Sequence, residues 1–141
     1  MNQVYLSSSP SETESIGVNL AKNSKSGDFY AFYGEMGSGK TVLIRGFVSA
    51  LIPHALVSSP TYAILNVYEG QDITVNHFDM YRITSSDDLM STGYDEIIQS
   101  GITVCEWPEN IEEDLPDCYW KIVFEKLSEN ERRIFVERIG E

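Results

Sequence analysis

Hydrophobic and polar positions alternate near the start of the chain, and the pattern predicts a strand followed by a helix. Residues 2–6 alternate as a short strand does. The stretch SPSE at residues 9–12 then has the spacing of a capping box, with Pro10 in the first helical position. We therefore expect a helix over residues 10–23 whose buried side includes Ile16, Leu20 and Ala21.

A second strand and helix enclose a glycine-rich loop. The aromatic run DFYAFY, residues 28–33, predicts a strand that ends where the glycines begin. The run TVLIRGFVSAL, residues 41–51, has apolar residues at helical spacing despite Gly46, and Pro53 ends it. The order strand, glycine loop, helix is the context in which a phosphate-loop motif becomes a structural prediction.

The middle of the chain predicts a hairpin and short helices. Residues 61–69 and 73–81 are rich in β-forming side chains and are joined by the turn Gly70-Gln71-Asp72. Residues 85–100 predict one or two short helices, with a break at Gly93.

The last third of the chain completes the sheet. Residues 102–107, ITVCEW, form the short apolar run that is typical of a strand buried in a parallel sheet. Residues 118–127 and 132–139 alternate around the turn SENE and predict a final hairpin. We expect an α/β fold with a mixed β-sheet flanked by helices, formed by a single domain over residues 1–141. In this sheet, residues 28–33 and 102–107 are parallel and hairpins extend both sides.

Composition narrows the range of partners and compartments. A chain of 141 residues with 42% hydrophobic residues has material for one core, and its net charge of -12 argues against gripping nucleic acid alone. Cys105 and Cys118 form neither a disulfide framework nor a zinc-ligand spacing, which favours a reducing compartment. Because no leader segment or membrane-length apolar run is present, we expect a cytoplasmic protein without membrane association.

The stretch GEMGSGKT, residues 34–41, fits the phosphate-loop pattern G-x-x-x-x-G-K-[ST]. Its glycines allow positive φ, so that backbone amides can point at phosphate oxygens. Lys40 would place its charge beside the β and γ phosphates, and the Thr41 hydroxyl would ligate Mg²⁺. The expected nucleotide-binding residues of the loop are Glu35, Met36, Gly37, Ser38, Gly39, Lys40 and Thr41.

Two acidic residues end predicted strands and could complete a metal site. Asp79 closes the run ITVNHFD, and Glu106 closes ITVCE. Mg²⁺ needs a carboxylate near Thr41, and the attacking water needs an orienting group. Spacing alone leaves open which acid has which role.

The segment SSPT, residues 58–61, lies where other NTPases of this type carry a loop that senses the γ phosphate. A simple Pro-terminated turn with hydroxyl caps is the alternative interpretation. His77 has no metal-ligand partner at a suitable spacing, and we expect it to support the structure or a ligand and not to act as a base.

Four sequence blocks together resemble the TsaE (YjeE) family, a group of small ATPases in bacterial threonylcarbamoyladenosine modification of tRNA. The blocks are GEMGSGKT, SPTY, HFDMYR and EWPE, in this order, and the resemblance extends over residues 9–110. It implies a P-loop NTPase fold and weak hydrolysis of Mg-ATP. The implied partners are the TsaB and TsaD proteins, with tRNA reached through their complex.

The resemblance also implies roles for individual residues. Thr41 and Glu106 match the Mg²⁺ ligands, and Asp79 matches an acid needed for turnover together with Lys40. Thr61 matches the switch-like loop, and Trp107 lies in the block beside the metal acid. An arginine of the last hairpin is expected near the nucleotide, and we favour Arg132 over Arg133.

The phosphate loop departs from the usual family sequence GDLGAGKTT. Glu35 replaces Asp and Ser38 replaces Ala, and both changes conserve the chemistry of the loop. Val42 replaces the second Thr, so no role can be given to that second hydroxyl.

Two other classes share a phosphate loop. Small-molecule kinases generally need an arginine-rich lid, whereas this chain has 10 Lys and Arg residues in total and no Arg-rich insertion. Nucleotide-dependent switch proteins of the GTPase kind carry an N-K-x-D stretch, which the sequence lacks. We therefore expect ATP as the nucleotide and water as the acceptor of its γ phosphate.

Overall fold

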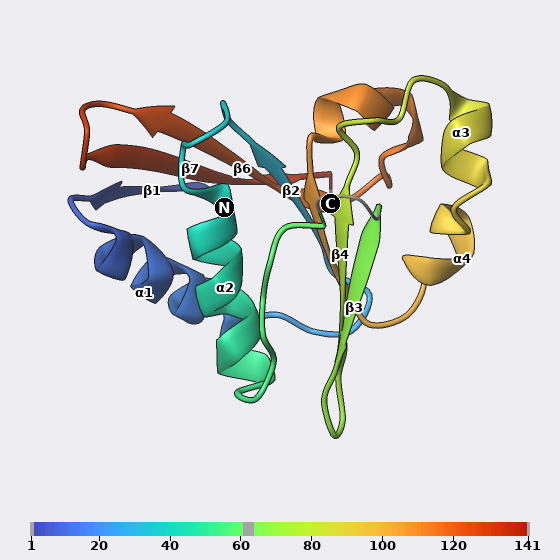
Figure 1. Cartoon of the computed structure of the whole chain (residues 1–141), viewed down its shortest axis with the longest axis horizontal. Helices are drawn as coiled ribbons and strands as arrows, with labels where there is room; N and C mark the ends of the chain where they lie inside the picture. The colour runs from blue at the N-terminus through green and yellow to red at the C-terminus, as the bar shows by residue number, and fades with distance from the viewer. Residues whose placement is uncertain (1, 61–63, 141) are drawn as a thin grey trace.

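A seven-stranded mixed sheet organises the protein, with strand order β1-β7-β6-β2-β5-β4-β3 (Figure 1). The structure is a computed structural model, and it describes residues 2–60 and 64–140. The strands are β1 (Asn2–Ser7), β2 (Phe29–Tyr33), β3 (Leu65–Glu69), β4 (Thr74–Asp79), β5 (Ile102–Glu106), β6 (Tyr119–Lys126) and β7 (Arg132–Ile139). The helices are α1 (Pro10–Ala21), α2 (Lys40–Leu51), α3 (Ser86–Met90), α4 (Tyr94–Ile97) and the 3₁₀ helix η1 (Pro108–Asp114).

The centre of the sheet is parallel and its sides are antiparallel. β2 pairs in parallel with both β5 and β6, and β5 pairs in parallel with β4. The β3–β4 hairpin forms one side, and the β6–β7 hairpin with β1 forms the other. The expected α/β fold, the parallel pairing of β2 with β5 and the two flanking hairpins are all confirmed.

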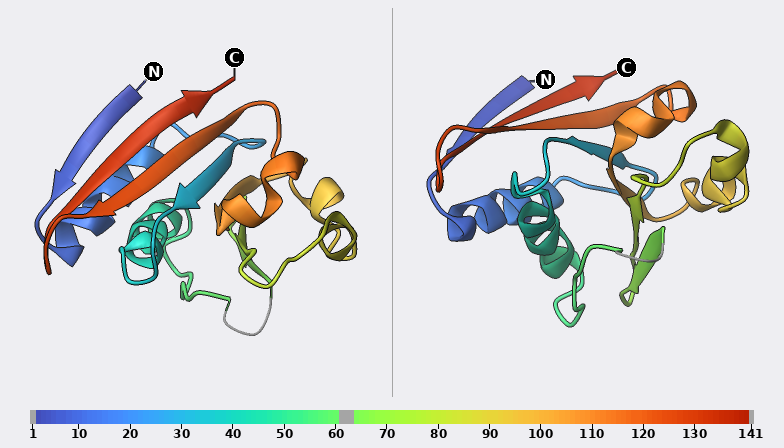
Figure 2. Two further views of the ribbon diagram at one scale, coloured as in Figure 1. Left: turned by 90° about the horizontal axis from the view of Figure 1, so that it is seen from above. Right: turned by 45° about the horizontal axis from the view of Figure 1, so that its top comes forward.

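Helices cover the two faces of the sheet in separate groups (Figure 2). α1 and α2 pack on one face, where Leu43 and Phe47 of α2 are fully buried in the cluster that holds Tyr30 and Phe32 of β2. α3, α4 and η1 lie against the opposite face, where Phe78 of β4 packs with residues such as Leu89, Tyr94 and Ile111. The alternation of side chains along β2, β4 and β5 therefore decides which cluster each residue joins.

The first helix is shorter than the sequence predicted. α1 ends at Ala21, not at residue 23, and Lys22 follows as its C-cap. At its start, the Glu12 N–H donates to Ser9 Oγ at 3.1 Å, while the Glu12 carboxylate accepts from the Ser8 N–H instead of the Ser9 N–H. On the predicted buried side, Ile16 and Ala21 are buried and Leu20 is partly buried.

The strand predicted over residues 73–81 ends earlier, at Asp79. The Asp79 carboxylate accepts a hydrogen bond from the Tyr81 N–H at 3.0 Å. The Tyr81 N–H therefore bonds this side chain and not a neighbouring strand, because a short acidic side chain can accept from the backbone N–H two residues further on. Within the described part of its partner, the strand begins at Leu65.

The region of residues 85–100 forms two short helices, as one of the predicted alternatives had it. Gly93 separates them with φ of 82°, a conformation that glycine adopts without steric cost. The 3₁₀ helix η1 was not predicted; it follows Trp107, whose φ of 59° turns the chain sharply after β5. Cys105 is buried and Cys118 exposed, and both are free. Over the described ranges, no helix is long and apolar enough to cross a membrane.

The crossing of α1 and α2 depends on two glycines. A Cβ at Gly46 of α2 would overlap the Glu14 carbonyl oxygen of α1, and one at Gly17 of α1 would overlap the Leu43 carbonyl oxygen of α2. Each helix thus approaches the backbone of the other directly. This close packing fixes α2, which carries Lys40 and Thr41 at its first turn.

We expect Gly46→Ala to lower the free energy of unfolding by about 1–2 kcal/mol, because a clash with backbone places the overpacking cost in the upper half of its range of about 1–3 kcal/mol and the helix-propensity gain offsets about 1 kcal/mol of it. Urea unfolding checks this. Arg45→Ala, at the exposed neighbouring position, is the control and should stay within about 0.5 kcal/mol of wild type. A Gly46→Ala protein as stable as wild type would show that the helices can separate without cost.

Candidate active site

The phosphate loop connects the end of β2 to the start of α2 and has the backbone shape that its glycines permit. Gly37 and Gly39 have φ of 81° and 104°, in the left-handed region that other residues rarely adopt. Gly39 is the N-cap of α2, so the loop leads directly into the positive end of a helix. Backbone amides and helix dipole together favour an anion at this position.

Lys40 is the cation of the loop, and its side chain is mostly buried. It is 6% exposed, and its Nζ donates to the Gly34 carbonyl oxygen at 2.7 Å. The same Nζ lies 4.4 Å from the centre of the Trp107 ring. Burial lowers the pKa of Lys40, while the nearby Glu106 carboxylate acts in the opposite direction. A desolvated ammonium of this kind attracts an anion more strongly than an exposed one does.

The two predicted acids lie side by side at the ends of parallel strands. Asp79 of β4 and Glu106 of β5 are register partners, and Glu106 is also the partner of Phe32 in β2. Because side chains alternate along a strand, Glu106, Asp79 and His77 share the face of the sheet on which α2 packs. Parallel pairing thus brings both carboxylates to the edge where the phosphate loop leaves β2.

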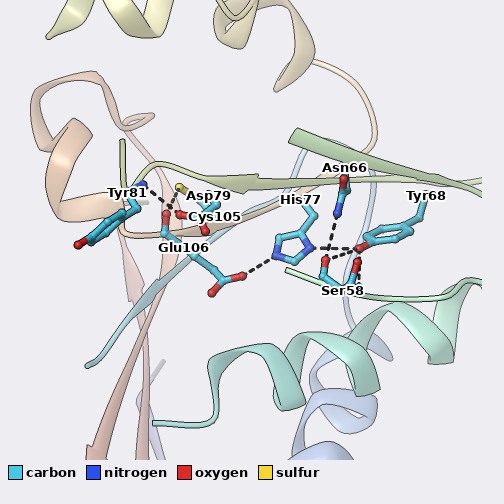
Figure 3. A network of polar contacts seen from close by, with 8 residues as sticks. All are labelled: Ser58, Asn66, Tyr68, His77, Asp79, Tyr81, Cys105 and Glu106. Atoms are coloured by element: carbon cyan, nitrogen blue, oxygen red, sulfur yellow. Dashed lines mark hydrogen bonds and ion pairs between the residues drawn. The ribbon is translucent and has the colours of Figure 1, made fainter. Parts of the chain in front are cut away.

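Glu106 and Asp79 have different surroundings (Figure 3). Glu106 is 4% exposed, and its Oε2 lies 2.7 Å from Nε2 of the fully buried His77. Asp79 is partly buried and accepts from the Tyr81 N–H. Burial raises the pKa of Asp79, and the Glu106 carboxylate raises it further. Asp79 therefore has a higher proton affinity than an ordinary surface aspartate.

A cavity of about 500 Å³ brings most of the predicted residues together. It is bounded by the phosphate loop, the ends of β4 and β5, the start of α1 and the β6–β7 turn. The predicted residues among its lining are Met36, Gly37, Gly39, Lys40, Thr41, Asp79, Glu106 and Arg132. The others are Ser9, Pro10, Thr13, Val42, Ser59, Trp107, Glu129 and Asn130.

Two of the described predicted residues, Glu35 and Ser38, are not part of that lining. Glu35 and Ser38 line a different hollow, on the side of the loop that faces β6 and β7. Ser38 Oγ is buried without a hydrogen-bond partner in the described part of the chain. Thr61 lies outside the described residues. Glu35 and Ser38 can still offer backbone amides to a nucleotide, and that role stays a prediction.

Arg132 holds the phosphate loop from the last hairpin. Its Nε donates to the Ser38 carbonyl at 2.9 Å, and its Nη2 to the Gly37 carbonyl at 3.3 Å. Nη1 donates to carbonyls of the β6–β7 turn at Ser128, Glu129 and Glu131. Arg133, in contrast, pairs with the exposed Glu125. The guanidinium of Arg132 therefore joins two carbonyls of the phosphate loop to the β6–β7 turn.

Three contacts of the site were not found by sequence reasoning. The sequence did not indicate that His77 contacts Glu106, that the Trp107 ring covers Lys40, or that turn residues Glu129 and Asn130 border the cavity. From this hairpin, the family resemblance had placed an arginine alone near the nucleotide. A usable signal existed for His77 alone: it lies two positions before Asp79, so strand alternation places both side chains on one face. The other two contacts depend on a backbone turn at residue 107 and on which strand β6 pairs with.

The oxygen donors of the cavity fit Mg²⁺ better than a softer metal. Thr41 offers a hydroxyl, and Glu106 and Asp79 offer carboxylates, the ligands that Mg²⁺ prefers. Among residues 2–60 and 64–140, no group of three or more His, Cys, Asp or Glu side chains is suited to a metal. Mg²⁺ commonly binds through one or two carboxylates together with substrate phosphates, which matches such a small donor set.

Comparison with known proteins gives a consistent result. The family model "Threonylcarbamoyl adenosine biosynthesis protein TsaE" matches residues 7–134. A tRNA threonylcarbamoyladenosine biosynthesis protein TsaE from Bacillus subtilis is 33% identical over 132 residues, which cover 93% of this chain and 82% of that protein. The protein of the same name from Treponema pallidum is 30% identical over 132 residues, covering 93% of this chain and 97% of that one.

Among solved structures, the crystal structure of Bacillus subtilis YdiB superposes with a TM-score of 0.82. The two chains are 28% identical, and the match covers 99% of this chain and 87% of YdiB. The sheet and helices described above therefore recur in a solved structure over nearly their whole extent.

We expect Arg132→Ala to loosen the phosphate loop, because five donated hydrogen bonds to carbonyls are lost. Amide hydrogen exchange at residues 37–39 should speed up by about fivefold or more, the ratio that corresponds to about 1 kcal/mol. Arg133→Ala removes a neighbouring arginine whose pair is exposed, and it should leave this exchange unchanged. Equal exchange in the two variants would contradict the bracing role of Arg132.

The raised pKa of Asp79 gives a pH-dependent test. Below the model-peptide value of 3.8 the carboxyl is protonated in both the folded and unfolded states, so it does not affect stability. As pH rises through the window from 3.8 to the raised folded-state pKa, the unfolded state ionises first and stability is lost. We therefore expect Asp79→Asn to be more stable than wild type at pH 7, and the difference between them to shrink as pH falls. A difference independent of pH, measured by urea unfolding, would contradict this assignment.

Proposed function

The chain belongs to the TsaE family of threonylcarbamoyl adenosine biosynthesis proteins, and we propose that it binds and hydrolyses Mg-ATP to support this tRNA modification. One observation carries the proposal: Lys40 and Thr41 of a phosphate loop line the same cavity as the acids Asp79 and Glu106. A cation, amides, a hydroxyl and two carboxylates are the groups that nucleotide hydrolysis requires.

Nucleotide binding uses the loop and the first turn of α2. The amides of residues 35–41 and the Lys40 ammonium bind the β and γ phosphates, and Lys40 exchanges its contact with the Gly34 carbonyl for a phosphate oxygen. Thr41 and Glu106 hold Mg²⁺, which when bound neutralises phosphate charge. His77 keeps the Glu106 carboxylate oriented, as groups behind a metal ligand generally do.

Asp79 is the residue that we assign to the attacking water. Its carboxylate lies at the register position next to Glu106, and the Tyr81 N–H fixes its orientation. The higher proton affinity that burial gives this carboxylate suits an acceptor of a hydrogen bond from water. The γ phosphate then goes to water, and the Lys40 ammonium and the loop amides stabilise the charge that develops.

Hydrolysis by the isolated chain is expected to be slow. Among the described residues that line the cavity, Arg132 is the one arginine, and backbone carbonyls already occupy its guanidinium. A contact from Arg132 to the nucleotide would come from Nη2, since Nη1 is turned to the carbonyls of the β6–β7 turn. We propose that the TsaB and TsaD proteins complete the site, as partner proteins do for other NTPases of low intrinsic activity.

The charge of the chain favours indirect contact with tRNA. At a net charge of -12, the electrostatic attraction to phosphates would have to come from the complex. We propose that the modification supported is threonylcarbamoyladenosine at position 37 of tRNA, formed by TsaB and TsaD. Both cysteines are free, which agrees with work in the reducing cytoplasm.

We expect Lys40→Ala to reduce ATP turnover by about 100-fold or more, because one preorganised donor is removed from the developing charge. Phosphate release under saturating Mg-ATP measures this. Undiminished release by the variant would place hydrolysis at some other site of the protein.

Glu106→Ala should weaken Mg²⁺-dependent ATP binding by about tenfold or more, which corresponds to about 1.4 kcal/mol of lost metal contact. Calorimetric titration of ATP with and without Mg²⁺ separates this loss from a general effect. Glu109→Ala removes a nearby exposed acid and is the matched control, expected to bind as wild type does. Normal Mg²⁺ dependence in the Glu106 variant would remove Glu106 from the metal site.

Addition of TsaB and TsaD should raise the rate of ATP hydrolysis, and tRNA modification over repeated turnovers should fail with a nonhydrolysable ATP analogue. An isolated rate that the partners leave unchanged contradicts the coupling. With γ-labelled ATP, the label is expected in inorganic phosphate. Transfer of the label to an organic acceptor would identify a kinase instead.

A further inference from the structure

A buried row of polar side chains leads away from Glu106 toward the loop before β3 (Figure 3). His77 Nε2 lies 2.7 Å from Glu106 Oε2, and His77 Nδ1 lies 3.3 Å from the Tyr68 hydroxyl. The same hydroxyl donates to the Ser58 carbonyl oxygen at 3.1 Å and accepts from the Ser58 N–H at 3.3 Å. The Asn66 amide donates to the Ser58 carbonyl at 3.0 Å. The Ser58 backbone is thus clamped by two side chains of β3.

Strand pairing produces this row. His77 of β4 is the register partner of Asn66 in β3, and Tyr68 is the partner of Val75. Tyr68 and His77 are therefore diagonal neighbours on the face that α2 covers, where long side chains can reach one another. His77 is fully buried and Tyr68 is 9% exposed. Polar groups buried this deeply are costly unless each one is hydrogen-bonded.

One arrangement of hydrogens satisfies every member. The single Tyr68 hydroxyl hydrogen can go either to the Ser58 carbonyl or to His77 Nδ1. In the second case Nδ1 accepts it, and His77 donates from Nε2 to the Glu106 carboxylate. The hydroxyl oxygen accepts from the Ser58 N–H, and the Ser58 carbonyl accepts from Asn66. Continuous hydrogen bonds then run from the Glu106 carboxylate to the Ser58 backbone. When the Glu106 carboxylate moves, its hydrogen bond to the His77 ring changes. The other nitrogen of that ring is hydrogen-bonded to the Tyr68 hydroxyl, which contacts the Ser58 backbone.

Both ends of this row reach the same cavity. Glu106 lines it from β5, and Ser59, next to the clamped Ser58, lines it from the loop. Among the described residues, His77 and Tyr68 are not part of the cavity lining and lie behind it. Their position behind the site is that of a connection between two of its walls.

We propose that His77 and Tyr68 are positioning residues that couple the orientation of Glu106 to the backbone of the loop at Ser58 and Ser59. This inference rests on the proposed function, because the coupling serves Glu106 as a holder of the Mg²⁺-nucleotide. Binding of the Mg²⁺-nucleotide at Glu106 then changes the hydrogen bonds of the loop at Ser58 and Ser59. Such coupling is reciprocal. The factor by which the nucleotide changes the affinity of the loop for a partner is also the factor by which that partner changes the affinity for the nucleotide.

The experiment measures amide hydrogen exchange at Ser58 by NMR, with and without a nonhydrolysable ATP analogue and Mg²⁺. Calorimetry on the same samples gives the affinity for the analogue with and without Mg²⁺. Tyr68→Phe removes the hydroxyl and keeps the ring. His77→Gln presents an amide nitrogen near the place of Nε2 and nothing at Nδ1. Tyr30→Phe, which removes a hydroxyl from the same buried cluster outside the row, is the matched control.

In the wild type and in Tyr30→Phe, the Mg²⁺-nucleotide should change Ser58 exchange by about fivefold or more, the ratio for one net hydrogen bond of about 1 kcal/mol. Tyr68→Phe and His77→Gln should still bind the analogue in a Mg²⁺-dependent manner but lose the exchange response. His77→Ala should lose both the response and part of the Mg²⁺ dependence, and His77→Gln should restore the Mg²⁺ dependence alone. A merely structural histidine would not separate these two readouts.

Two results would overturn the coupling. One is a full exchange response in Tyr68→Phe or, if that variant does not fold, in His77→Gln. The other is a wild-type protein that binds the Mg²⁺-nucleotide while Ser58 exchange stays unchanged. Failure of the wild type to bind at all would instead reject the proposed function, and the coupling with it, so the two failures can be told apart.

Discussion

The parallel register of β2, β5 and β4 is the constraint on which the site depends. Glu106 is level with Phe32 at the end of β2 and with Asp79 at the end of β4. Since side chains alternate along each strand, a slip of β5 by one residue would turn Glu106 into the apolar cluster around Phe78 and Tyr94. The burial of both faces of β5 makes such a slip costly, so apolar packing determines where the carboxylates lie. The positions of Glu106 and Asp79 at the carboxyl ends of their strands thus follow from the packing of the core.

The carboxyl ends of these strands gather buried charged side chains that the stability of the fold does not require. Lys40 and Glu106 are almost fully buried, and Asp79 is held where burial raises its pKa. Desolvated charges disfavour folding unless they are paired, and here the ammonium contacts a carbonyl and an aromatic ring while Glu106 contacts His77. Such a concentration of partly compensated charge is common where stability is exchanged for function. Arg132 adds a restraint by donating hydrogen bonds to the Ser38 and Gly37 carbonyls of the loop.

Much of the fold could be predicted from the sequence, because its patterns are local. The aromatic run of β2, the glycines of residues 34–39 and the helical spacing of α2 each specify their own geometry. Asp79 and Glu106 could be named because both close apolar strands, although spacing did not assign their roles. The 3₁₀ helix η1 was missed because it follows Trp107, a non-glycine residue with positive φ that no local pattern indicates. The contacts of Arg132 and of Tyr68 were missed for another reason: they join residues far apart in the chain, through pairings that only the assembled sheet defines.

The most direct measurement is a crystal structure of the protein grown with Mg²⁺ and a nonhydrolysable ATP analogue. We expect the triphosphate in the phosphate loop, with Lys40 Nζ moved from the Gly34 carbonyl to a phosphate oxygen, and Mg²⁺ between Thr41 and Glu106. A loop without nucleotide, or a nucleotide bound elsewhere on the protein, would contradict this.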